Sequence, residues 1–267
     1  MRRVRYRVRA YNTATESTNK IHDDEVARRF GFRGGLVPGV DVYAYLCHVP
    51  AARWDRDWLE RGTIAARFSS PVYDGDEVEI TGVPDGERAV DLVLVDPTGS
   101  RCAEGRAALP DKVVEPPPID DWPAGGPPEA APVPTPEILA TRPFGHLTVH
   151  YRAERADEYL DDVREELPLF RNERIAHPGW LLRFANYVLT TNVRLGPWIH
   201  VESTVRFFGT VTDGDLVETR ALVAGEYERK GHDFVDLDVL QLVDDRPVAR
   251  TAHTAIYRPR ATPGEAR

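Results

Sequence analysis

Hydrophobic and polar residues alternate strictly over residues 3–10. One face of this segment carries Val4, Tyr6, Val8 and Ala10, and the other carries Arg3, Arg5, Arg7 and Arg9. This period of two predicts a strand with one face in water. Residues 23–30 predict a short charged helix that ends at Gly31, a common residue after a helix C-terminus. Residues 38–48 are apolar on most sides and therefore predict a buried helix.

The second part of the chain follows the same order of elements. A stripe at helical spacing consists of Trp180, Leu181, Phe184 and Val188. Strand-like runs follow at residues 88–96 in the first part and at residues 233–245 in the second. Each part therefore predicts a strand, a short helix, a long apolar helix and several strands. An antiparallel sheet that wraps around a long central helix in each part is typical of the α+β class.

A segment rich in proline and glycine separates the two parts. The sequence EPPPIDDWPAGGPPEAAPVPTPE, at residues 115–137, is unsuited to a helix or a central strand. It predicts an extended linker without regular secondary structure. We therefore expect an N-terminal domain over 1–112, a linker over 113–142 and a C-terminal domain over 143–267.

Two repeated motifs indicate that the parts arose by duplication. RFSSPVYDGDEVE begins at Arg67 and RFFGTVTDGDLVE begins at Arg206, so the offset is 206 − 67 = 139, and 8 of the 13 positions are identical. Pro-Gly pairs at 38–39 and 178–179 each precede a long apolar segment. Proline is favoured in the first turn of a helix because it loses no needed N–H bond there.

The composition excludes several classes of protein. The formal net charge is −9, whereas general nucleic-acid-binding proteins carry a basic surface. No apolar run approaches the roughly 18 residues of a membrane helix, and no apolar signal segment follows the basic N-terminus. The cysteines, Cys47 and Cys102, suggest neither a disulfide framework nor a metal site. We expect a cytoplasmic globular protein without cofactor, metal, membrane or nucleic-acid partner, since phosphate loops and dinucleotide fingerprints are also absent from the sequence.

Three stretches resemble the MaoC-like dehydratases, which include the (R)-specific enoyl-CoA hydratases. STNKIHDDEVARRFGF contains the family's Asn-x-x-His as Asn19 and His22. GGLVPGV, at residues 34–40, resembles the start of the family's central helix, and RFSSPVYDGDEV resembles the strand and turn that follow. The resemblance covers most of residues 10–109 and, more weakly, the second part. It implies a duplicated hotdog fold and reversible hydration of a 2-enoyl-CoA or a related thioester.

Hydration needs a base for water, an acid for the α-carbon and donors for the thioester oxygen. The resemblance implies that His22 transfers protons and that Asn19 holds the water or the ring. Ser17 stands where the family has an Asp, and Lys20 stands where it often has a Pro. The missing acid is then sought among the nearby carboxylates, namely Glu16, Asp23, Asp24 and Asp41. Gly39 and Asp24 are candidate substrate-binding residues, because Gly39 places an unpaired N–H at a helix N-terminus.

Each candidate also has a structural explanation. Asn19 and His22 can cap the helix at 23–30, since Asn is a good cap. Asp24 and Asp41 stand in first turns of helices, where acids are favoured electrostatically. Gly39 can serve close packing. The arginine face of the first strand can attract coenzyme A phosphates or simply face water.

The second part lacks the candidate site. Positions 161 and 162, which correspond to His22, are both Asp, and His177 fits the start of a helix better than a ligand site. The sequence therefore predicts an enoyl-thioester hydratase or dehydratase that binds an acyl-CoA or acyl-carrier thioester. One alternative is a thioesterase with Asp41 or Glu16 as base. Another is a catalytically silent acyl-CoA-binding or partner subunit, which Ser17 would explain, and a homodimer is one candidate assembly.

Overall fold

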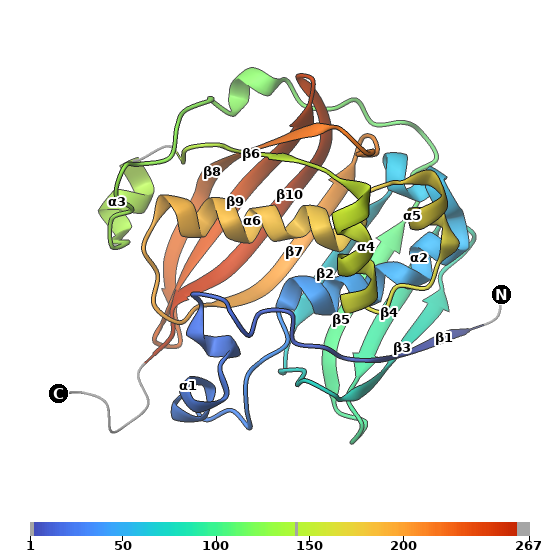
Figure 1. Ribbon diagram of the computed structural model, residues 1–267, viewed down its shortest axis with the longest axis horizontal. Coiled ribbons are helices and arrows are strands. Elements are labelled where there is room, and N and C mark those ends of the chain that lie inside the picture. The colour runs from blue at the N-terminus through green and yellow to red at the C-terminus, as the bar shows by residue number, and fades with distance from the viewer. Residues whose placement is uncertain (1–2, 142–143, 261–267) are drawn as a thin grey trace.

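The computed structural model describes residues 3–141 and 144–260, and over these residues ten strands form one antiparallel sheet (Figure 1). The strand order is β1-β3-β4-β5-β2-β7-β10-β9-β8-β6. The first half supplies β1 (Val4–Arg9), β2 (Thr63–Phe68), β3 (Glu77–Pro84), β4 (Ala89–Val95) and β5 (Arg101–Ala108). The second half supplies β6 (Leu147–His150), β7 (Ile199–Phe207), β8 (Leu216–Arg229), β9 (His232–Val243) and β10 (Arg246–Arg258). The expected α+β class is confirmed.

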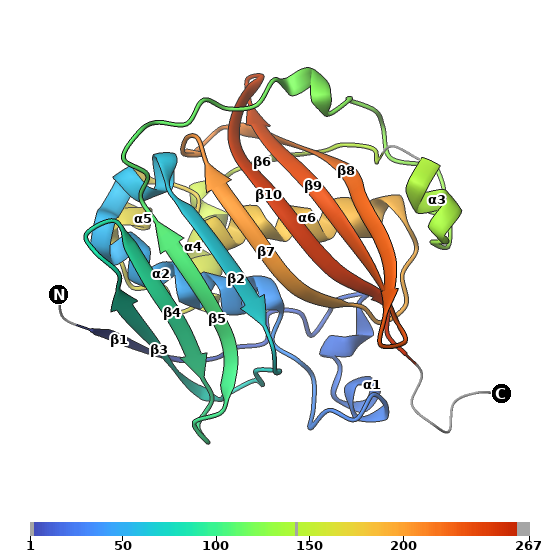
Figure 2. The same ribbon diagram turned by 180° about the vertical axis from the view of Figure 1, so that it is seen from behind.

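Helices cover one face of this sheet, and the opposite face is seen from behind in Figure 2. The first half has η1 (Lys20–His22), a 3-10 helix, α1 (Asp24–Arg29) and α2 (Gly39–Arg61). The second half has α4 (Ala153–Asp162), α5 (Pro168–Glu173) and α6 (Pro178–Asn192). Helix α2 runs beyond the expected residues 38–48, with Pro50 inside it and a kink at Asp55, where φ is 53°. Proline is a common cause of distortion because it removes one helical hydrogen bond.

The two halves meet where β2 pairs with β7. At the centre of this pairing Ala65 lies opposite Thr204, and 204 − 65 = 139, the offset of the sequence repeat. Equivalent strands therefore face each other in antiparallel register, as they do across a two-fold axis. The duplication predicted from the sequence thus produces one continuous sheet rather than two separate ones.

The repeated Asp-Gly-Asp turns have the same hydrogen bonds in both halves. Gly75 and Gly214 adopt positive φ angles of 78° and 98°, which glycine reaches without steric cost. The Asp74 carboxylate accepts a bond of 2.8 Å from the Asn12 N–H. The Asp213 carboxylate accepts one of 2.9 Å from the Ala153 N–H. The first Asp of each repeated turn therefore binds the backbone just after the first strand of its half, β1 or β6.

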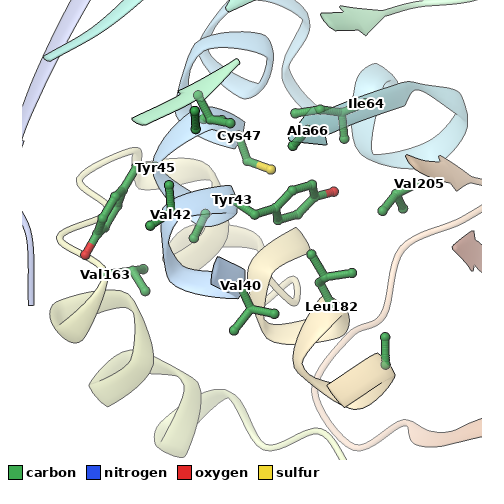
Figure 3. Packing of buried hydrophobic residues seen from close by; sticks show 14 of the residues in the cluster. Val40, Val42, Tyr43, Tyr45, Cys47, Ile64, Ala66, Val163, Leu182 and Val205 are labelled. Carbon is green, nitrogen blue, oxygen red and sulfur yellow. The ribbon is translucent and has the colours of Figure 1, made fainter. Parts of the chain in front are cut away.

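The main core lies between the two long helices and the sheet (Figure 3). Tyr43 of α2 is fully buried, and its ring lies among Ile64 of β2, Val205 of β7 and Leu182 of α6. Elements of both halves thus share one apolar cluster. Burial of large side chains at this junction contributes about 1.5–3 kcal/mol per side chain and holds the halves together.

The segment between the halves is more ordered than its composition predicts. It contains η2 (Ile119–Asp121) and α3 (Pro136–Thr141), so the expectation of no regular secondary structure is wrong. Trp122 is buried against Leu240 and Leu242, and its Nε1–H donates to the Asp238 carbonyl over 3.0 Å. One aromatic anchor therefore fixes an otherwise extended chain on the sheet. Among the described residues, no helix is both long and apolar enough to span a membrane.

Candidate active site

His22 ends helix η1 with a defined tautomer. Its Nδ1 lies 2.7 Å from the Leu36 carbonyl oxygen. Because a carbonyl oxygen only accepts hydrogen bonds, Nδ1 carries the hydrogen, and Nε2 of the neutral ring is unprotonated and can accept. Burial lowers the pKa of His22, although the Leu36 carbonyl and the Asp41 charge act in the opposite direction. The ring is therefore neutral at neutral pH and can accept a proton at Nε2.

Asn19 connects this histidine to the second half of the chain. Its Nδ2 donates to the Trp198 carbonyl over 3.0 Å, and its Oδ1 accepts from the Trp198 N–H over 3.2 Å. The same Nδ2 lies 3.4 Å from His22 Nε2. Asn19 caps η1 through a bond from the Ile21 N–H, whereas the cap of α1 is Asp23. The amide is therefore held in one orientation, with its Nδ2 as donor to the unprotonated Nε2 of His22.

Two cavities meet at His22. The inner chamber, of about 260 Å³, is lined mainly by apolar side chains such as Leu36, Val42, Val72 and Ile256. The outer mouth, of about 340 Å³, is lined mainly by polar side chains such as Thr13, Ser17, Thr18 and Thr190. The residues common to both linings are Asn19, His22, Pro38, Asn186 and Trp198. An elongated ligand with a polar and an apolar part can thus place its junction at His22.

The N-terminus of α2 forms one wall of the inner chamber. Gly39 is the first residue of α2, and the preceding Pro38 makes no side-chain cap bond. The Asp41 and Val42 N–H groups donate to the Pro38 carbonyl. The N–H groups left unpaired within the helix at its start are therefore those of Gly39 and Val40, at its positive dipole end. A Cβ at Gly39 would lie 2.8 Å from His200 Nδ1. The absence of a side chain therefore lets a second histidine approach the helix start.

His200 also belongs to the site, although no motif in the sequence pointed to it. It lies on β7, lines the inner chamber and is only 6% exposed. Its Nε2 lies 2.8 Å from Ser203 Oγ, which lies 2.9 Å from His253 Nδ1. The pairing of β7 with β10 sets Ser203 opposite His253. Burial lowers the pKa of His253 to about 3, and burial together with His253 lowers the pKa of His200 well below its usual value.

Asp41 lies in the core, away from both cavity linings. Its side chain is completely buried, with Oδ1 2.9 Å from Arg183 Nη2 of α6. Its Oδ2 accepts a bond of 2.6 Å from the Thr13 hydroxyl, which accepts one of 2.9 Å from Arg183. Burial by itself lowers the pKa of the Arg183 guanidinium, but the nearby Asp41 and Tyr159 raise it, and the net result is a raised pKa. Both oxygens of this carboxylate are thus engaged in joining the two halves.

The other acidic candidates lie nearer the surface. Asp24 accepts bonds from the Gly35 N–H over 2.8 Å and from Arg28 over 3.0 Å, so it holds the loop before α2. Glu16 lines the outer mouth and is the one carboxylate among the described residues that line either cavity. Ser17, beside it, accepts a bond of 3.1 Å from the Asn19 N–H. Of the acidic candidates, the fold thus brings only Glu16 to the cavity, at its outer end.

The equivalent position in the second half is filled with side chains. His177 caps α6 by accepting a bond of 3.0 Å from the Gly179 N–H, which confirms its helix-start role. A Cβ at Gly179 would overlap the Tyr159 hydroxyl. Glu165 lies 3.6 Å from His177 Nε2 and 2.9 Å from His48 Nδ1. The helix N-terminus that is open at Gly39 is therefore closed here.

Comparisons with known proteins support this architecture. No family model and no curated protein matches the sequence. A MaoC domain protein from Chloroflexus aurantiacus, provisionally described as a dehydratase, aligns with a TM-score of 0.61 at 13% identity, covering 97% of this chain and 95% of that one. A protein from Novosphingobium aromaticivorans, provisionally described as a thioesterase, aligns with a TM-score of 0.58 at 10% identity, covering 96% of each chain.

A third similar structure names the fold. A conserved hypothetical protein from Mycobacterium tuberculosis, described as having a double hotdog fold, aligns with a TM-score of 0.57 at 14% identity. This alignment covers 96% of the present chain and 95% of the other. The chain therefore has a double hotdog fold, as the resemblance to MaoC-like dehydratases implied. Proteins described as dehydratases and as thioesterases both share it.

Proposed function

We propose that the protein hydrates a 2-enoyl thioester, or catalyses the reverse dehydration. The acyl chain occupies the apolar inner chamber, and the carrier arm leaves through the polar outer mouth. The observation that carries this proposal is the unprotonated Nε2 of His22 at the junction of the two cavities. A half-buried, neutral imidazole in that place is suited to general-base catalysis.

In the proposed reaction His22 serves as base and then as acid. Nε2 takes a proton from water, and the oxygen of that water forms a bond with the β-carbon. The electron pair of the double bond moves toward the thioester carbonyl, giving an enolate. The imidazolium then returns its proton to the α-carbon, which restores neutral His22 and balances the reaction. Unpaired N–H groups at the start of α2 stabilise the enolate oxygen.

Polar groups beside His22 can orient the attacking water. Asn186 of α6 lines both cavities, and its Oδ1 is buried without a hydrogen-bond partner among the described residues. A water molecule that donates one hydrogen to Asn186 and the other to His22 is held for attack. We assign Asn19 to holding the His22 region against Trp198, because its amide oxygen and nitrogen are already bonded there.

Hydrolysis of a thioester is a second candidate function, favoured by the lack of a carboxylate in the inner chamber lining of the described chain. Hydrolysis needs one base and donors for an oxyanion, and His22 with the start of α2 supplies both kinds of group. In this version the water attacks the thioester carbonyl carbon, and the thiol leaves. The sequence analysis considered Asp41 or Glu16 as the base of such a thioesterase, and we assign this role to His22 instead.

A panel of 2-enoyl-CoA esters of increasing chain length separates the candidates. Hydration removes the enoyl absorbance without releasing thiol, whereas hydrolysis releases free thiol. We expect the first result. Thiol release with retention of the double bond would establish the thioesterase instead. Binding of the esters without either signal would establish a catalytically silent acyl-CoA-binding protein.

Substitutions test the role of His22 and the effect of Ser17, which stands in place of the family's Asp. His22→Ala should lower kcat by about 10²–10⁴, the usual effect of removing a general base. His150→Ala is the control, because His150 is exposed on β6. Ser17→Asp should raise hydration if the rate is limited by the lack of the family's carboxylate, and an Asp oxygen can still accept the bond from the Asn19 N–H. Unchanged turnover in folded His22→Ala would remove His22 from the mechanism.

A further inference from the structure

His200, Ser203 and His253 form a string of buried side chains joined by two hydrogen bonds. All three side chains are buried, and two ring nitrogens lack hydrogen-bond partners among the described residues, His200 Nδ1 and His253 Nε2. His200 Nδ1 adjoins Gly39 at the start of α2, and the ring lines the inner chamber. A buried polar atom without a partner carries a cost unless a ligand supplies the partner.

The direction of the hydrogen bonds in this string determines whether His200 Nδ1 carries a hydrogen or a lone pair. The Ser203 hydroxyl has one hydrogen, so it donates to one ring and accepts from the other. If it donated to His253, that ring would keep an N–H at Nε2 with no acceptor in the core. If it donates to His200, His253 Nε2 is a bare lone pair instead. Each arrangement therefore leaves one ring N–H without a protein acceptor among the described residues, on His253 in the first and on His200 in the second. The His200 ring lines the chamber, where a ligand can accept this hydrogen, whereas His253 does not line it, so the second arrangement is favoured.

In this arrangement His200 carries its hydrogen on Nδ1. We propose that His200 donates this hydrogen to the carbonyl oxygen of the bound thioester, beside the unpaired backbone N–H groups at the start of α2. The inference rests on the proposed function for the identity of the ligand. It holds equally for hydration and for hydrolysis, because negative charge develops on the same oxygen in both reactions.

A neutral imidazole suits this task better than a charged one. A donor that is fixed before the reaction stabilises developing charge without reorganisation, and a neutral ring keeps its proton instead of losing it to the enolate. Ser203 and His253 do not line the chamber, so we assign them as positioning residues that select the His200 tautomer. The β10 strand thus contributes to the site through β7.

Nitrogen NMR of the histidine rings tests the tautomer in the wild-type protein. We expect His200 and His253 to be neutral at pH 7, both with the proton on Nδ1, and a His200→Gln variant assigns the signals. Ser203→Ala should give His200 a mixture of tautomers. A proton on Nε2 of His200 in the wild-type protein would overturn the inference whatever reaction the protein catalyses.

Binding of two unreactive analogues tests the contact with the carbonyl. One is a saturated ketone of coenzyme A in which a methylene replaces the sulfur, and the other is the matching S-alkyl thioether, which has no carbonyl. The wild-type protein should bind the ketone more tightly, by about 3–10-fold for each net hydrogen bond that the carbonyl accepts. His200→Phe keeps a ring of similar shape and should lower this preference by about 3–10-fold, because the backbone donors of α2 remain, whereas the exposed control His150→Phe should leave it unchanged.

The outcomes separate this inference from the proposed function. If His200→Phe and the wild type show the same preference for the ketone, His200 does not contact the carbonyl, although thioester chemistry stands. If the wild type binds neither analogue, the proposed thioester ligand is refuted, and this inference fails with it. A weaker preference in His200→Phe, with the Nδ1 tautomer in the wild type, supports the assignment. In turnover, that variant should lower kcat by about 10²-fold with little change in KM.

Discussion

The Asp41–Arg183 ion pair provides a test of how the halves are joined and of which groups do chemistry. Asp41 is completely buried, whereas the Arg183 side chain is 20% exposed and lies over the Tyr159 ring at 4.2 Å. The two partners therefore differ in what remains when the other is removed. We consider Arg183→Met, which removes the cation, and Asp41→Asn, which keeps the shape of the acid.

Arg183→Met should be the more damaging change. It leaves the Asp41 carboxylate buried with the Thr13 hydroxyl as its remaining bond, and removing one partner of a buried pair costs about 3–5 kcal/mol of unfolding free energy. Asp41→Asn should cost about 1–3 kcal/mol, because an amide oxygen can still accept one bond and Arg183 reaches water. The double variant contains neither charge, so it should be more stable than Arg183→Met alone.

Urea unfolding at pH 7 measures these differences, with Arg101→Met as a control. Arg101 pairs with Glu104 on the surface, so its loss should cost under about 1 kcal/mol. Turnover of each folded variant is measured in parallel, and Asp41→Asn should keep it within a few-fold. If Arg183→Met were no less stable than Asp41→Asn, the reasoning about a stranded buried carboxylate would be wrong. If Asp41→Asn stayed stable but lost turnover, Asp41 would be a catalytic group.

Three further predictions concern the site and the connecting segment. Burial lowers the pKa of His22, so the active neutral form persists as pH falls; the acid limb of kcat/KM should have its midpoint below about 6.5, and a midpoint above that value would contradict the buried-base assignment. Gly39→Ala should lower kcat and cost about 1–3 kcal/mol of unfolding free energy, because the added methyl overlaps the buried, hydrogen-bonded His200 ring. Equal turnover and stability would refute the close approach. Trp122→Ala should leave far-UV circular dichroism unchanged but speed limited proteolysis within residues 115–137, and unchanged cleavage would show that Trp122 does not anchor this segment.

The two halves and their main elements could be predicted from the sequence because the signals are local. Alternation at residues 3–10 and the apolar segment after Gly39 reflect the periods of strand and helix, which depend on neighbours along the chain. The 139-residue offset predicted the duplication, and the structure then shows that the equivalent residues Ala65 and Thr204 lie opposite each other where the halves meet. The composition of the connecting segment predicted an extended linker without regular secondary structure. This was wrong in part, because composition does not show that one residue, Trp122, is buried on the sheet and holds the segment there.

The candidate site was only partly accessible to the same reasoning. Asn19 and His22 are three residues apart, so one helical turn brings them together, and their proximity follows from the sequence. The residues that complete the site come from the second half of the chain. Trp198 accepts a hydrogen bond from Asn19, and His200 lies against Gly39. Arg183 engages Asp41 across 142 residues of chain. Such contacts depend on the pairing of β2 with β7 and the packing of α2 on α6, and no local period encodes which side chains meet there.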